Sequence, residues 1–153
     1  IRDAQESRGL GDVYKRQTTA CYEGANTNLG VLQFPDTATA AVQTSLRLEG
    51  TVSYVNLVGH WRSSATSGSV VWQVQTACVD DGGLGDPAWS TPQTIVDATK
   101  TTALQFNQFS LTGLGACSTG QLMFVRLFRD PAHASDNLNA TAELLGVTWE
   151  VVR

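Results

Sequence analysis

The chain has 153 residues, of which 42% are hydrophobic and 16% are charged, and it carries a formal net charge of −4. This length suits one domain with a sizeable core, and low charge with abundant Thr, Val and Gly favours strands over helices. The acidic balance argues against a nucleic-acid partner. We also expect no membrane partner, because no apolar run approaches the roughly 20 residues of a membrane span.

The first seventeen residues differ from the rest of the chain, because they are charge-rich and aperiodic. Residues 7–17 (SRGLGDVYKRQ) resemble the translation of a sequencing-library adapter, whose transposon end GAT GTG TAT AAG AGA CAG encodes the last six. Scars of this kind are excluded from fold reasoning. We therefore expect residues 1–17 to be a non-native, disordered tail and residues 18–153 to form the domain. The alternative is a genuine basic tail that binds a partner.

The first half of the domain predicts several strands. Residues 18–30 read as a loop-like lead-in, and residues 30–34 as a short strand that ends before a proline. Residues 41–48 alternate between apolar and polar, as in a half-buried strand. Residues 54–79 then predict two long strands joined by the turn SSATSG at 63–68, whose small, polar residues and glycine favour a hairpin. We expect the other strands to pack on this pair.

The second half begins with a long irregular stretch and then returns to strands bounded by turn residues. The strand candidates are residues 94–97, 104–111, 121–129 and 144–152. About eight strands with no convincing amphipathic helix predict an all-β fold, an antiparallel β-sandwich or jelly roll.

The three cysteines show no metal-ligand spacing, and we expect no metal and no cofactor. Cys78 ends a strand beside a glycine-rich loop, and Cys117 lies in a turn before another strand. A disulfide between them would contribute about 3–4 kcal/mol on the loop-entropy model. Two buried thiols that pack as small hydrophobes are an equally weighted alternative. Cys21 lies in the N-terminal loop, and its partner is upstream if the DNA read was truncated.

The irregular stretch contains three acidic residues, Asp80, Asp81 and Asp86. Carboxylate oxygens are candidate ligands for Ca²⁺, but this spacing does not match an EF-hand loop. Asp and Gly also dominate turns for conformational reasons. We therefore favour a turn over a binding loop for these three residues.

Charged residues bracket a second loop, FRDPAHASD. Arg129 and Asp130 lie at its start and Asp136 ends it. One interpretation is a polar binding loop. We favour the other, in which Arg129 pairs with Asp136 or Asp130 and pins the loop, because nothing nucleophilic lies nearby.

Tryptophans give the main indication of ligand binding, because exposed aromatic rings stack on sugar rings. Trp61, Trp72 and Trp149 fall on the apolar phase of strands, so we expect them in the core. Trp89 lies in a loop flanked by prolines. It either caps the end of the sandwich or lines a shallow site, and we favour the cap.

No motif specifies catalysis, and we expect no catalytic residue. The two histidines, His60 and His133, accompany no GxSxG nucleophile elbow. His60 lies on the more polar phase of its strand, so we expect it on the surface.

The stretches SATSGSVVW and RDPAHASD resemble a group of short, uncharacterised β-sandwich sequences from environmental and phage-associated data. The similarity covers nearly all of residues 20–153. It implies a jelly-roll-like module with a structural or attachment role.

We therefore expect a non-enzymatic module of a phage virion, such as a tail or capsid accessory protein, or of an extracellular surface. Its expected partners are other virion proteins or further copies of this chain. The alternative is a carbohydrate-binding module, with a glycan as the partner and Trp89 in its site.

Overall fold

The computed structural model describes residues 18–23, 27–115 and 117–153, and it folds them into nine strands. The strands are β1 (Thr18–Glu23), β2 (Asn28–Phe34), β3 (Ala40–Arg47), β4 (Tyr54–Ser63), β5 (Ser69–Val79), β6 (Gln93–Ala98), β7 (Asn107–Gly115), β8 (Leu122–Arg129) and β9 (Ala142–Val152). Among these residues there is no helix that is long and apolar enough to cross a membrane. The prediction of a disordered tail concerns residues 1–17, which lie outside the described residues.

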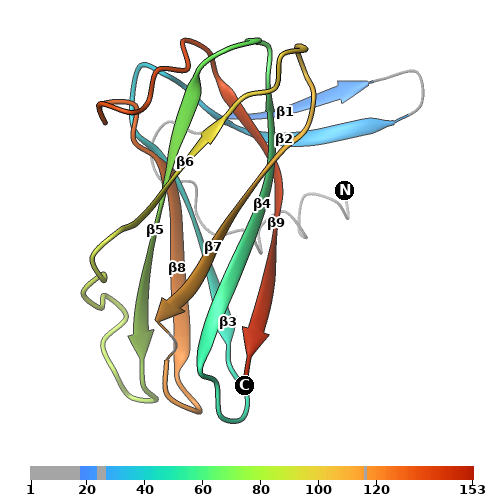
Figure 1. The fold of residues 1–153 in the computed structure, drawn as a ribbon. Helices are drawn as coiled ribbons and strands as arrows, with labels where there is room; N and C mark the ends of the chain where they lie inside the picture. Colours follow the sequence, from blue (N-terminus) through green and yellow to red (C-terminus); the bar gives the residue numbers. More distant parts are fainter. Residues whose placement is uncertain (1–17, 24–26, 116) are drawn as a thin grey trace.

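The strands form two antiparallel sheets that pack face to face (Figure 1). Sheet A has the order β1-β2-β9-β4-β7, and sheet B has the order β3-β8-β5-β6. The predicted all-β antiparallel sandwich is therefore confirmed. Alternate residues of each strand point inward. On β4, Val55, Leu57 and Trp61 are fully buried, whereas His60 is exposed as expected.

The strands β4 and β5 do not form the hairpin that their sequence predicts. β4 pairs with β7 and β9, whereas β5 pairs with β6 and β8, so the turn between them crosses from one sheet to the other. In this turn Gly68 has a φ of 102°, and a Cβ there would meet the backbone of Asn137. Two successive strands with apolar inner faces can pair within one sheet or lie in two sheets that face each other. Alternation of apolar and polar residues is the same in both cases, so it does not distinguish a hairpin from a turn that joins the two sheets.

The segment expected to be a loop-like lead-in contains a ninth strand, β1. All six residues of β1 pair with β2, from Thr18 opposite Gln33 to Glu23 opposite Asn28. The prediction of a loop was wrong because the backbone partners of β1 come from β2, and local composition does not reveal such pairing. Figure 1 shows that β1 and β2 extend outward at one side of the sandwich.

Aromatic rings from both sheets meet at the centre of the core. The ring of Trp72 lies 5.0 Å from that of Phe34, 6.1 Å from that of Trp61 and 5.2 Å from that of Phe109. Trp61 and Trp72 are fully buried, so their expected place in the core is confirmed. Trp149 was also expected in the core, but it is only partly buried and packs against the core cluster. Edge-to-face and stacked pairs of this kind add to the stabilisation from burial alone.

Substituting Gly59 by alanine is expected to lower the free energy of unfolding by about 1–3 kcal/mol, because overpacking strains a close-packed core. A Cβ at Gly59 would overlap the ring carbons of Phe109. That ring is stacked on Trp72 and has little room to move. The matched control is Gly115→Ala, because a Cβ at that strand position meets nothing within 4 Å. Urea unfolding of both variants tests this; equal stabilities would contradict the packing described.

Candidate functional site

Trp89 lies over the outer face of sheet B. The amide N of the next residue, Ser90, donates to the carbonyl O of Thr76 on β5 at 2.9 Å, and the Thr76 amide donates to Ser90 Oγ at 3.0 Å. These two contacts hold the β5–β6 loop against the sheet. They place the Trp89 ring 4.6 Å from the guanidinium carbon of Arg126 on β8. Trp89 therefore covers the sheet surface and does not cap the end of the sandwich.

Arg126 occupies the middle of this surface. Its Nε donates to Oε1 of Gln75 at 3.2 Å, and its Nη2 donates to the same oxygen. Gln75 in turn donates through Nε2 to the carbonyl O of Ser90 at 2.8 Å. The guanidinium carbon of Arg126 also lies 5.6 Å from the ring of Phe128. The cation therefore lies close to two aromatic rings, an arrangement favoured by the negative potential of ring faces.

The pairing of β8 with β3 and β5 extends this surface onto both neighbouring strands. On β8, the partly buried residues at 124, 126 and 128 alternate with core residues and point outward. Gln43 on β3 lies opposite Arg126, and Gln73 on β5 lies opposite Phe128. Residues directly opposite each other share a face of the sheet. We call this surface the sheet B platform; its members are Gln43, Gln73, Gln75, Trp89, Phe124, Arg126 and Phe128.

The acidic residues of the same loop do not form a metal site. Asp80, Asp81 and Asp86 are exposed, and within the described ranges no three His, Cys, Asp or Glu residues are placed to hold a metal ion. Asp80 Oδ1 instead accepts a hydrogen bond from Gln121 Nε2 at 2.9 Å. Gly83 donates through its amide to the carbonyl O of Asp80 at 2.9 Å, which is the hydrogen bond of a turn.

Arg129 binds Asp136 and pins the loop between β8 and β9. Its Nη2 donates to Asp136 Oδ1 at 2.7 Å, and its Nε donates to Oδ2 at 3.0 Å. Asp130 takes a different partner, because its Oδ2 accepts from Gln73 Nε2 at 3.4 Å. This arrangement corresponds to the loop-pinning interpretation, with Asp136 as the partner of Arg129.

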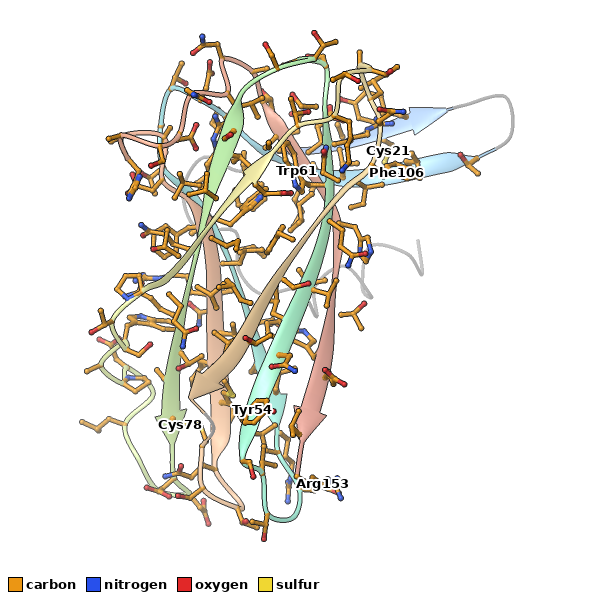
Figure 2. All side chains as sticks on the ribbon, viewed as in Figure 1. Cys21, Tyr54, Trp61, Cys78, Phe106 and Arg153 are labelled. Carbon is orange, nitrogen blue, oxygen red and sulfur yellow. A yellow bond between two sulfur atoms is a disulfide. The ribbon has the colours of Figure 1, made fainter. Side chains whose placement is uncertain are left out.

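Cys78 and Cys117 form a disulfide, with their Cα atoms 5.5 Å apart. Figure 2 shows Cys78 and Trp61 toward opposite ends of the sandwich. The bond joins the end of β5 in sheet B to the turn that follows β7 in sheet A. It therefore links the two sheets at the end away from Trp61. Cys21 is an exposed thiol on β1.

Among the residues that the structure describes, two titratable groups have shifted pKa values. Tyr22 donates a hydrogen bond to Glu143, which also accepts from Arg62 Nε at 2.7 Å. That bond, followed by burial and the carboxylate charge, raises the pKa of Tyr22. Burial raises the pKa of Asp97, although the hydrogen bond from Trp61 Nε1 at 2.6 Å opposes the shift. Trp61, which contacts Asp97, and Arg62, which contacts Glu143, are successive residues of β4 and point to opposite faces of sheet A. Tyr22 and Asp97 therefore do not converge on one pocket.

No protein-family model matches the sequence, and no curated protein sequence is significantly similar to it. Solved structures with a similar fold include an arabinose-bound α-L-arabinofuranosidase, MgGH51, with a TM-score of 0.54 and 12% identity over 95% of this chain and 24% of that one. The xylan-binding domain CBM22-1 of Xyn10C from Paenibacillus barcinonensis has a TM-score of 0.48 and 13% identity over 93% and 85% of the two chains. The enzymatically active domain of tailspike protein 4 from bacteriophage CBA120 has a TM-score of 0.49 and 10% identity over 92% and 18%. At these identities the similarity concerns the fold alone.

Most of the sheet B platform was not predicted from the sequence, which singled out only Trp89. The signal that was available is the polar phase of β5, where Gln73 and Gln75 take positions that face solvent in a sandwich. Phe124 and Phe128 gave no comparable signal, because the apolar run of β8 hides which of its residues point outward.

Proposed function

We propose that this chain is a non-enzymatic carbohydrate-binding module whose glycan lies on the sheet B platform. The observation that carries the proposal is the arrangement of Trp89, Arg126 and Phe128 on one outward face, with glutamine side chains beside them. The argument depends on these side chains and not on the fold, because one fold serves many functions.

The chemistry of the platform matches that of a sugar ring. The flat faces of a pyranose carry C–H groups, which pack on the electron-rich face of an indole or phenyl ring. Its rim carries hydroxyl groups, which both donate and accept hydrogen bonds. Amide side chains such as those of Gln43 and Gln73 offer both functions. The Arg126–Gln75 hydrogen bond fixes part of this surface before a ligand arrives, which lowers the entropic cost of binding.

An extracellular location fits this function, because disulfides such as Cys78–Cys117 persist in oxidising compartments. The absence of a catalytic role remains a prediction. An attachment role in a virion also stays a prediction, because no contact of the described residues bears on it.

The substitution Trp89→Ala is expected to weaken glycan binding at least tenfold, because large aromatic rings at the centre of a contact contribute most of its energy. The wild-type chain is first screened on a glycan array. Affinity electrophoresis in gels that contain a glycan found on the array then compares the wild type with the variant.

The matched control is Phe106→Ala, which removes an aromatic ring that is 58% exposed and precedes β7 of sheet A. Figure 2 shows Phe106 near the same end of the sandwich as Trp61. This variant is expected to bind like the wild type. If the wild type binds no glycan, or if Trp89→Ala binds as well as Phe106→Ala, the proposal is wrong.

A further inference from the structure

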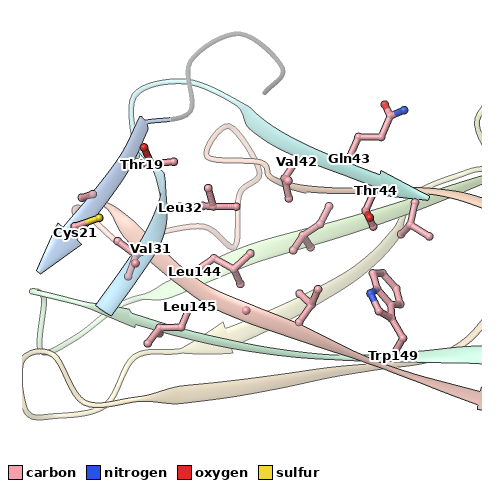
Figure 3. Close-up of a pocket in the computed structure, with 16 residues that line it drawn as sticks. Thr19, Cys21, Val31, Leu32, Val42, Gln43, Thr44, Leu144, Leu145 and Trp149 are labelled. Atoms are coloured by element: carbon pink, nitrogen blue, oxygen red, sulfur yellow. The ribbon is translucent and has the colours of Figure 1, made fainter. Parts of the chain in front are cut away.

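A second site lies inside the sandwich, where the two sheets separate on the β1–β2 side. It is a cleft of about 410 Å³ lined by sixteen residues from β1, β2 and β9 of sheet A and from β3 and β8 of sheet B (Figure 3). Figure 3 shows Val42 and Thr44 of β3 pointing into the cleft, whereas Gln43 points away from it. The interior of the cleft and the sheet B platform therefore lie on opposite faces of β3, and Gln43 is the residue that the two sites share.

The cleft follows from the unequal widths of the two sheets. Sheet A has five strands and sheet B has four, and β3 is the last strand of sheet B on this side. The inner face of the β1–β2 pair therefore extends beyond β3. On the opposite side, by contrast, Gln93 of β6 donates to the carbonyl O of Gly113 on β7 at 3.3 Å, which ties the sheets together.

A β-bulge in β9 accompanies this opening. Trp61 of β4 lies opposite Leu144, but the preceding residue His60 lies opposite Gly146, so Leu145 is an extra residue in β9. A bulge bends its strand and increases the local twist. Leu144, Leu145 and Gly146 all line the cleft, so the bend falls at the point where the sheets separate.

The lining of the cleft selects an apolar ligand. None of the sixteen lining residues is charged, and most are aliphatic. An ion would lose its hydration without gaining a partner, and a sugar would leave several hydroxyl groups without hydrogen bonds. An alkyl group has no hydration shell of this strength and no hydroxyl groups that need hydrogen bonds. Its binding is favoured because its apolar surface is removed from water.

The shape of the cleft selects a linear ligand. Lining residues of β9 run from Leu144 to Trp149, a span of roughly 17 Å at about 3.3 Å per residue. The glycines at 30 and 146 also line it, and a Cβ at either would meet nothing within 4 Å. We propose that the cleft binds the alkyl chain of a small amphiphile, such as a fatty acid, and leaves its polar head in water.

The probe is a fatty acid brominated along its chain, which quenches tryptophan fluorescence at short range. Trp149 lines the cleft, so saturable quenching is expected in the wild-type chain, and its amplitude is expected to fall in Trp149→Phe. The remaining quenching comes from Trp61, which lies opposite Leu144 of the cleft. The substitution Gly30→Leu places a branched side chain in the open space of the cleft and is expected to weaken binding at least tenfold. The matched control is Gly115→Leu, because a Cβ at that position also meets open space in a strand away from the cleft.

Three results would overturn the proposal. The first is no saturable quenching in the wild type. The second is equal binding by Gly30→Leu and Gly115→Leu, or an unchanged quenching amplitude in Trp149→Phe, because the probe then binds elsewhere. The third is a dimer in light scattering that the probe does not dissociate, because a second copy of the chain then occupies the cleft.

Discussion

Replacing Arg129 by methionine is expected to lower the free energy of unfolding by about 3–5 kcal/mol, because it leaves a buried charge without its partner. The Arg129 side chain is fully buried, and that of Asp136 is only 2% exposed. The guanidinium also donates to three backbone carbonyls, those of Phe34, Leu138 and Ala140. The substitution therefore removes hydrogen bonds that join the end of β2 to the β8–β9 loop. Urea unfolding followed by tryptophan fluorescence measures the loss.

A matched control and a double variant sharpen this test. Arg47→Met removes an arginine whose side chain is 76% exposed, and it is expected to cost less than about 1 kcal/mol. The double variant Arg129→Met with Asp136→Leu removes both charges and is expected to lose less than the sum of the two single substitutions. Similar losses in Arg47→Met and Arg129→Met would show that the buried pair does not hold the loop.

Removing the disulfide by the double substitution of Cys78 and Cys117 with alanine is expected to cost about 3–4 kcal/mol. The bond closes a sequence separation of 39 residues. It therefore restricts the unfolded chain considerably, and its loss stabilises the unfolded state more than it disturbs the folded one. Urea unfolding of the oxidised wild type and of the variant gives the difference.

Two controls accompany the disulfide experiment. Cys21→Ser replaces the exposed thiol and is expected to leave stability within about 0.5 kcal/mol of the wild type. Treatment of the wild type with a reductant is expected to reproduce the loss seen in the double variant. Coincident unfolding curves for the oxidised and reduced wild type would mean that no such bond stabilises the protein.

The strands were predictable to the extent that their residues alternate. Val55, Leu57 and Trp61 are buried where period two puts them, because a strand that faces a core must alternate whichever sheet it joins. The pairing of strands was not predictable in this way. β4 and β5 are separated by a short turn and yet belong to different sheets. β1 was missed because its residues read locally as a loop, and they form a strand through their pairing with β2.

The candidate site was predictable only at one residue. Trp89 was singled out because it lies in a loop between prolines, whereas the other three tryptophans fall on the apolar phase of strands. Its contact with Arg126, 37 positions later in the chain, depends on how β5 and β8 pair. The cleft was not predictable at all, because its walls come from five strands that are scattered along the sequence.

The class of fold follows from the sequence alone, because alternating hydrophobicity, scarce charge and frequent turn residues act locally and favour strands. The sequence also supplied the charged residues of the Arg129–Asp136 ion pair and the cysteines of the Cys78–Cys117 disulfide. The pairing of strands into sheets, the partner that each of these groups takes and the position of the cleft became known from the three-dimensional fold. Those outcomes depend on contacts between residues far apart in the chain, which local patterns do not encode.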